Sequence, residues 1–341
     1  MHKLIQLIKN VNKTHKRLGP LVAVNILAAK AKMCVLNVAP AGCGKSSACD
    51  ITHSLMKDNA LKYTSITLAG LVKQIDALSN FTGHVIIDDL GAEKSLWSRV
   101  STITTLATLV HTHNVHKVTQ AFDMQISNFD GSAALNIQPV LLNSLVQSDD
   151  WIAVIRDKVL RYYHLIRPIE PNPNIPALKL EWSVPLSKVE PIKHKGKLWY
   201  QLVAIGLTQW SYARCNEHIP KLVRAAAALD GRTQITKEDY NLIIKLLRPM
   251  QLERYMVTSY GFEEGRNFQN NVYCILVEIV SHGTPSIEMV CEDYKINPST
   301  AERVIATSPD WCWLKSNSPK KLMPTDEATR ILNLIGVYQK W

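Results

Sequence analysis

The sequence predicts an α/β fold, in which a mainly parallel sheet is followed by a helical region and a small C-terminal domain. Three observations predict it. Short apolar runs alternate with helical patterns between residues 33 and 165, which is typical of parallel strands joined by helices. Residues 198–247 then become helical in pattern. Residues 266–341 follow a separate pattern of three helices separated by turns.

The first half of the chain contains the predicted sheet. Its apolar segments predict strands at residues 33–38, 63–67, 84–88, 132–136 and 161–166. Helical spacing of apolar residues predicts helices at residues 45–56, 71–78 and 97–113. The amphipathic segment 1–9 predicts a first helix rather than a secretion signal, because it lacks a continuous apolar core.

Prolines and capping residues set the boundaries in the second half. Six prolines between residues 168 and 191 exclude a continuous helix there. Residues 219–229 predict a helix with Pro220 in its first turn. Thr236 and Asp239 have the spacing of a capping box. We therefore expect four regions: an α/β domain (1–167), a proline-rich linker or insertion (168–197), a helical region (198–262) and a C-terminal domain (263–341).

Composition narrows the class of protein. An apolar fraction of 46% supports a sizeable core, and no run approaches the roughly eighteen apolar residues of a membrane span. The formal net charge of +10 favours a polyanionic partner such as nucleic acid. The cysteines form no CxxC pair and are odd in number, which favours a reducing, intracellular compartment over disulfides or a zinc site: Cys34, Cys43, Cys49, Cys215, Cys274, Cys291 and Cys312.

The strongest motif is Ala39-Pro-Ala-Gly-Cys-Gly-Lys-Ser46, between a predicted strand and a predicted helix. Backbone N–H groups must turn inward to wrap phosphate oxygens, so small residues are needed where the chain approaches them. Lys45 then reaches the β- and γ-phosphates of ATP, and the Ser46 hydroxyl binds Mg²⁺. The strict pattern begins with glycine, and Ala39 is tolerated there if its φ is negative. We expect the nucleotide to contact Ala41, Gly42, Cys43, Gly44, Lys45, Ser46 and Ser47.

A second motif, Val85-Ile-Ile-Asp-Asp89, ends a predicted buried strand about forty residues after the loop. Asp88 at the strand tip is expected to hold the Mg²⁺ through water, and Asp89 is the candidate base that polarises the attacking water. Two solvated acids in a turn are the alternative. The strand and helix that separate this motif from the loop favour the catalytic interpretation.

These motifs resemble those of AAA+ ATPases over about residues 20–250. The proline-containing loop is similar to the family's loop, and Asp-Asp-Leu-Gly91 is similar to the ending found in helicase-loader members. The resemblance implies a P-loop NTPase sheet with a helical lid over residues 198–247, ATP and Mg²⁺ as cofactors, and a homo-oligomeric ring or spiral with active sites between subunits. It also implies a sensor 1 residue, which Asn136 matches, although a strand-end asparagine also caps helices. A hairpin over residues 125–132 would touch DNA.

The family also uses arginines at the nucleotide. One reaches the γ-phosphate of the neighbouring subunit and stabilises the charge of the transition state. Arg156 and Arg161 stand at the expected place, and Arg156 is preferred, against an ordinary ion pair with Asp157. The sensor 2 residue is expected on the lid, where the candidates are Arg214, Lys221 and Arg224. Arg224 is preferred. The alternative is that these residues only form a solvated face of a helix.

The C-terminal pattern predicts a winged helix-turn-helix. Its helices are expected at residues 268–281, 286–294 and 299–306, followed by Trp311-Cys-Trp-Leu314 and a turn that contains lysine and proline. Such domains bind DNA or dock other proteins, and DNA is preferred here. The candidate contacts are groove-facing residues of the recognition helix and phosphate-binding lysines of the wing: Thr300, Arg303, Lys315, Lys320 and Lys321.

The predicted function is therefore an AAA+ ATPase that couples ATP binding and hydrolysis to action on DNA, in replication, helicase loading or mobile-element transposition. The alternative is an AAA+ remodeller of protein complexes, with the winged helix as a protein adaptor. A third candidate is a regulatory nucleotide switch of the STAND type. That class is expected to carry long repeat or effector segments, for which 341 residues leave no room.

Overall fold

The computed structural model describes residues 1–90, 95–119, 122–146, 151, 155–165, 184–192, 195–253, 286–294, 297–307, 312–315, 320–326 and 329. Within these ranges, five parallel strands form one sheet in the order β2-β3-β6-β1-β7. The predicted α/β fold with a parallel sheet is confirmed. The strands are β1 (Cys34–Val38), β2 (Ala60–Tyr63), β3 (His84–Ile87), β6 (Ser132–Ile137) and β7 (Val159–Tyr163).

Four of the five strands are buried on both faces. Every residue of β1, β3, β6 and β7 is buried, whereas β2, at the edge of the sheet, is mostly half-buried. Because helices cover both faces of a parallel sheet, such strands form nearly continuous apolar runs. Four large polar side chains interrupt these runs and must therefore find partners inside the protein: Asn37, His84, Asn136 and Arg161.

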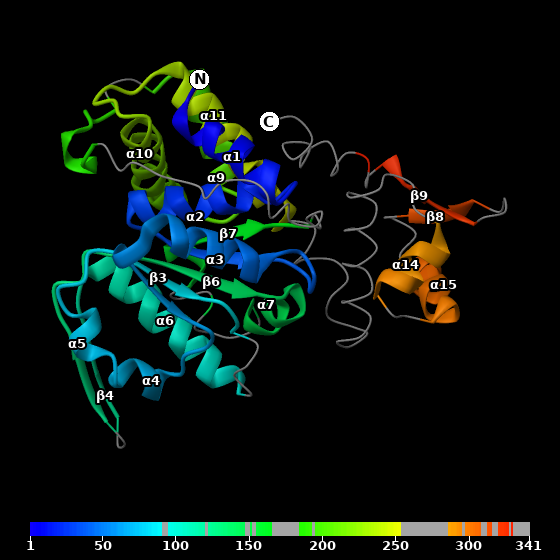
Figure 1. Cartoon of the computed structure of the whole chain (residues 1–341), viewed down its shortest axis with the longest axis horizontal. Helices are drawn as coiled ribbons and strands as arrows, with labels where there is room; N and C mark the ends of the chain where they lie inside the picture. Colours follow the sequence, from blue (N-terminus) through cyan, green and yellow to red (C-terminus); the bar gives the residue numbers. More distant parts are fainter. Residues whose placement is uncertain are drawn as a thin grey trace.

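Helices lie on both faces of the sheet (Figure 1). α2 (Gly19–Ala31) and α3 (Lys45–Met56) cover one face, and α6 (Leu96–Thr112) covers the other. α2 is buried on nearly all sides, because α1 (Lys3–Thr14) and the helical region pack on it from outside. Such a helix is expected to be apolar all round, yet it contains the fully buried Asn25.

The helical region consists of α9 (Lys197–Gly206), α10 (Tyr212–Leu229), α11 (Lys237–Leu247) and the 3₁₀ turn η4 (Arg248–Leu252). α10 packs on α2, and η4 packs against β7. The capping box at the start of α11 is confirmed, since the Asp239 carboxylate accepts from the backbone N–H of Thr236. The predicted start of α10 is wrong: the helix begins at Tyr212, where Ser211 is the N-cap, and Pro220 lies inside it.

Two segments of the α/β region also differ from expectation. The second strand begins and ends earlier than predicted, and the helix expected at residues 71–78 is split in two, because tight turns follow Gly70 and Leu71. The strands of the hairpin lie at residues 115–118 and 123–126, so the hairpin overlaps the predicted residues 125–132 only at its second strand, and the two strands pair antiparallel. The short elements are η1 (Lys57–Asn59), α4 (Leu68–Val72), α5 (Ile75–Leu78), β4 (Val115–Val118), β5 (Asp123–Ile126), α7 (Pro139–Val146), α8 (Arg156–Lys158) and η3 (Leu186–Lys188).

At the C-terminal end, α14 (Ile287–Tyr294) and α15 (Pro298–Thr307) confirm two of the three expected helices. A hairpin of β8 (Cys312–Lys315) and β9 (Lys321–Pro324) follows. The helix expected at residues 268–281 lies outside the described residues, so the winged helix stays a prediction. No helix of the described ranges combines the length and the apolarity that a membrane-spanning segment needs.

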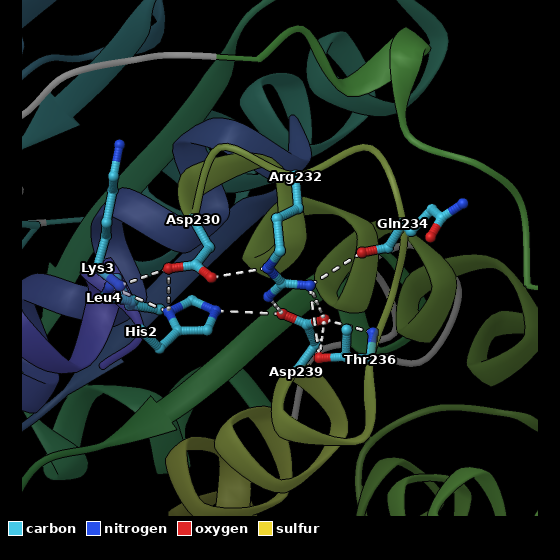
Figure 2. Close-up of polar contacts among 8 residues, drawn as sticks. All are labelled: His2, Lys3, Leu4, Asp230, Arg232, Gln234, Thr236 and Asp239. Atoms are coloured by element: carbon cyan, nitrogen blue, oxygen red, sulfur yellow. Dashed lines mark hydrogen bonds and ion pairs between the residues drawn. The ribbon is translucent and has the colours of Figure 1, made fainter.

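The N-terminal segment is joined to the helical region by a buried polar cluster (Figure 2). Nε2 of His2 lies 3.1 Å from Oδ1 of Asp239, and Nδ1 of the same ring accepts from the backbone N–H of Leu4. The Arg232 guanidinium donates to both Asp239 oxygens, at 2.6 and 3.0 Å, and to Asp230 at 2.7 Å. Burial alone would raise the pKa of Asp239, but donors from His2, Arg232 and Thr236 outweigh it and lower that pKa to about 2.

This lowered pKa predicts an acid-sensitive contribution to stability. A carboxyl with a depressed pKa in the folded state stabilises fully above its unfolded value of about 3.9 and loses that contribution as pH falls towards 2. A shift of this size corresponds to about 2 kcal/mol. Urea unfolding between pH 5 and 2 should therefore show a steeper loss of stability in the wild type than in Asp239→Asn. Equal slopes would contradict the lowered pKa of Asp239. The exposed Asp76→Asn serves as the control.

Candidate functional site

The loop between β1 and α3 has the backbone that phosphate binding requires. Gly42 and Gly44 have φ values of 77° and 76°, the left-handed region that favours glycine. Ala39 is absent from the described residues with positive φ, so alanine is tolerated at that position. The first N–H groups of α3 have no partners within the helix, and a helix N-terminus with its dipole attracts anions.

Lys45 lies at the start of α3 with its ammonium folded over the loop. Its Nζ donates to the carbonyl oxygens of Ala39 at 2.6 Å and Pro40 at 2.8 Å. Burial lowers the pKa of Lys45, and the nearby negative charges of Asp89 and Asp88 oppose that shift. The two acids and the ammonium therefore lie within electrostatic reach of one another. Ser46, the next residue of α3, is exposed.

The tip of β3 presents the two acids differently. The backbone N–H of Asp88 donates to Tyr63, and that of Asp89 donates to Thr64, so the end of β2 holds both residues in place. Asp88 is half-buried and Asp89 is exposed. An exposed carboxylate at a strand tip is accessible to water, whereas a half-buried one is better placed to hold a fixed partner.

Asn136 connects these parts. β6 lies between β1 and β3 in the sheet, so the tip of β6 stands between the loop and the acids. Nδ2 of Asn136 donates to Oδ1 of Asp88 at 3.1 Å and contacts Sγ of Cys49 at 3.1 Å. Among the described residues its side chain contacts Asp88, Cys49 and Asn37, and no hydrogen bond of the alternative role, a cap of the following helix, is seen there.

Two residues behind Asn136 were not predicted. Nδ2 of Asn37, in β1, donates to Oδ1 of Asn136 at 3.1 Å and to Oδ1 of Asn25, in α2, at 2.9 Å. The signal in the sequence was a single asparagine inside each of two apolar segments, Val-Leu-Asn-Val38 and Val-Ala-Val-Asn-Ile26. Buried asparagines of this kind require internal hydrogen-bond partners.

The candidate arginines occupy contrasting environments. Arg161 is fully buried, and its guanidinium donates to the Glu253 carboxylate at 2.7 and 2.8 Å and to three backbone carbonyls. It is therefore committed to the core. Arg156 is exposed. The alternative considered for it, an ion pair with Asp157, is not formed in the described part of the chain, where that carboxylate accepts from Ser211 instead. Arg156 precedes β7, so it lies at the edge of the sheet opposite the loop that follows β1.

The structure does not bring the sensor 2 candidates to the loop. Arg224 donates to the carbonyl oxygens of Leu186 and Val189. Leu186 lines a pocket with Lys32 and Gly83, which precede β1 and β3. Arg224 therefore lies near the amino ends of the strands, and the phosphate loop lies at their carboxyl ends. The Glu217 carboxylate accepts from the other two candidates, Arg214 and Lys221, and Arg214 also contacts His111 of α6.

The C-terminal candidates are only partly described. Arg303 and Lys321 are exposed. Lys320 is exposed as well, and its ammonium donates to Glu302 at 2.7 Å. The side chains of two candidates lie outside the described residues: Thr300 and Lys315.

The oxygen donors at the loop fit Mg²⁺. The described residues contain no group of three or more His, Cys, Asp or Glu side chains that could hold a metal by themselves. Mg²⁺ does not require such a cage, because it is usually bound by one or two protein oxygens together with water and substrate phosphates. The Ser46 hydroxyl and the Asp88 carboxylate are oxygen donors of this kind.

Comparisons with known proteins assign the chain to no family. No family model matches it, and no curated protein matches it. Among solved structures it is similar to the apo structure of the NrS-1 C-terminal region, with a TM-score of 0.27 and 13% identity over 94% of this chain and 74% of the other. A likeness this low supports no conclusion on fold or function.

Proposed function

We propose that this protein is a Mg²⁺-dependent ATPase of the AAA+ type that acts on DNA. The observation that carries the proposal is the meeting of the phosphate loop, Asp88 and Asn136 at the carboxyl edge of one parallel sheet. Ligands of open α/β sheets bind at this edge. A loop that only bound phosphate would not need an acidic strand tip and a buried amide aimed at it.

The residues divide the reaction between them. The loop amides and Lys45 bind the β- and γ-phosphates, and Ser46 and Asp88 would hold Mg²⁺, which neutralises charge on the phosphates when it is bound. Asn136 holds Asp88 in position. The Asp89 carboxylate orients a water molecule for attack on the γ-phosphorus and accepts its proton.

A second subunit would complete the site. Arg156 is exposed at the opposite edge of the sheet from the loop, so it is poorly placed to reach the phosphates bound by its own chain. It is well placed to stabilise charge on a nucleotide bound by a neighbouring copy. This part of the proposal predicts that the protein forms oligomers when ATP is added. Light scattering would measure this assembly as an increase in molecular mass.

The ATPase proposal is tested by Lys45→Ala. Losing one charged hydrogen-bonding group should weaken Mg²⁺–ATP binding about 10- to 100-fold and reduce turnover with it. Isothermal titration and phosphate release measure the two effects. Lys73→Ala removes an exposed lysine outside the site and should leave both unchanged. Wild-type affinity in Lys45→Ala would show that the loop does not bind the phosphates.

The DNA part of the proposal rests on the net charge of +10 and on the exposed basic residues of the C-terminal helices and hairpin. The wild-type protein should bind duplex DNA, and its affinity for the DNA should fall as the salt concentration rises, because phosphate contacts release counterions. Absence of affinity at low salt would favour the protein-remodelling alternative.

A further inference from the structure

Three buried asparagines form a continuous chain of hydrogen bonds that ends on Asp88. Oδ1 of Asn25 accepts from Nδ2 of Asn37, whose second hydrogen bond goes to Oδ1 of Asn136. Nδ2 of Asn136 then donates to Asp88. The three asparagines are each at most 1% exposed. The chain therefore runs from α2, across β1 and β6, to the tip of β3.

The register of the sheet brings the two strand residues together. Asn37 and Asn136 are paired positions on neighbouring parallel strands, so their side chains leave the sheet on the same face. α2 and α3 cover this face (Figure 1), and they supply the other two contacts, Asn25 and Cys49.

The direction of the chain is set by Asp88. An ionised carboxylate only accepts hydrogen bonds, whereas an amide has a donor side and an acceptor side. Asn136 must therefore turn its NH₂ group to Asp88 and its oxygen to β1. Asn37 must then present its own NH₂ group, and Asn25 its oxygen. One orientation of each amide satisfies the whole chain.

Packing alone does not account for these asparagines. Oδ1 of Asn37 and Nδ2 of Asn25 are buried without a hydrogen-bond partner in the described part of the chain, which is unfavourable. The neighbours of Asn37 in β1 are Leu36 and Val38, both fully buried. An apolar residue would suit the same position in the strand.

We infer that Asn37 is a positioning residue for ATP hydrolysis: it fixes the amide of Asn136, and through it the carboxylate of Asp88. The inference rests on the proposed ATPase activity. Asn37 does not touch the nucleotide, so its loss affects turnover rather than nucleotide affinity. Without the donor of Asn37, the oxygen of Asn136 loses the contact that holds it on the β1 side, so the amide holds Asp88 in a less fixed position.

The test measures kcat and nucleotide affinity separately in Asn37→Leu and Asn37→Val. Leucine is close in size to asparagine, and valine suits a strand. If one of the two variants fails to fold, the other still tests the inference. Both variants should lower kcat about tenfold while KM and the affinity for Mg²⁺–ATP change less than twofold. Val35→Ala is the matched control, since Val35 lies two residues earlier on the same face of β1 and is fully buried.

A purely structural role predicts a different pattern. The Asn37 variants would then resemble Val35→Ala, with lower thermal stability and unchanged kcat in the folded protein, and the inference would be overturned. Loss of affinity together with kcat would also overturn it. Absence of ATP hydrolysis by the wild type would instead reject the proposed function, so the two failures are distinguishable.

Discussion

Replacing Glu253 with glutamine is expected to destabilise the protein by about 3–5 kcal/mol. The carboxylate receives two donors from Arg161, at 2.7 and 2.8 Å, and the hydroxyl of Tyr163 at 3.2 Å. Arg161 is fully buried in β7. Neutralising its partner leaves a buried guanidinium without a counter-charge, and removing one member of a buried pair is far more costly than removing both.

Urea unfolding of the variants measures this effect. The double change Arg161→Met with Glu253→Leu removes both charges and should recover most of the lost stability. Asp130→Asn breaks an ion pair with Lys32 whose two side chains are 48% and 40% exposed, and an exposed pair of this kind contributes at most about 1 kcal/mol. A loss in Glu253→Gln no larger than in Asp130→Asn would contradict a buried, desolvated pair.

This ion pair also explains why the sequence alone did not decide between the two candidates for the arginine that reaches the neighbouring subunit. Arg161 and Arg156 are both plausible from sequence, because each follows the expected sensor strand. Their environments are set by distant residues. Glu253 lies 92 positions from Arg161, and Gln209, which binds its backbone N–H, lies 48 positions away. No local pattern reports such contacts.

The parts that sequence predicted well are those with local causes. The phosphate loop depends on two glycines and on a strand followed by a helix, and all of these are written in consecutive residues. The asparagine chain depends instead on the register between β1 and β6 and on the packing of α2. Asn136 was predicted through a resemblance, whereas Asn37 was visible only as a polar interruption in an apolar strand.

The lid candidates illustrate the same limit. α10 has the alanine-rich, amphipathic pattern of a helix that packs on another element, but the pattern does not say which element. It packs on α2, so Arg224 reaches backbone carbonyls near the amino ends of the strands rather than the phosphate loop. The position of a helix relative to a site depends on the tertiary fold.

Asp89→Asn is expected to lower kcat about 10²- to 10⁴-fold while Mg²⁺–ATP still binds. Asparagine keeps the size of the side chain and its ability to contact water, but it does not accept a proton. Asp89 is exposed at the tip of β3, whereas the neighbouring Asp88 is held by Asn136. In the proposed mechanism Asp89 therefore transfers the proton, and Asp88 makes the fixed contact.

Phosphate release under saturating ATP measures the loss of turnover, and titration with Mg²⁺–ATP checks that binding survives. Asp76→Asn changes an exposed acid on α5, outside the site, and should hydrolyse ATP at the wild-type rate. Normal turnover in Asp89→Asn would remove its assignment as the base. The water would then have to be oriented by Asp88 or by a residue of a neighbouring subunit. In the first case, the roles proposed for the two acids would be reversed.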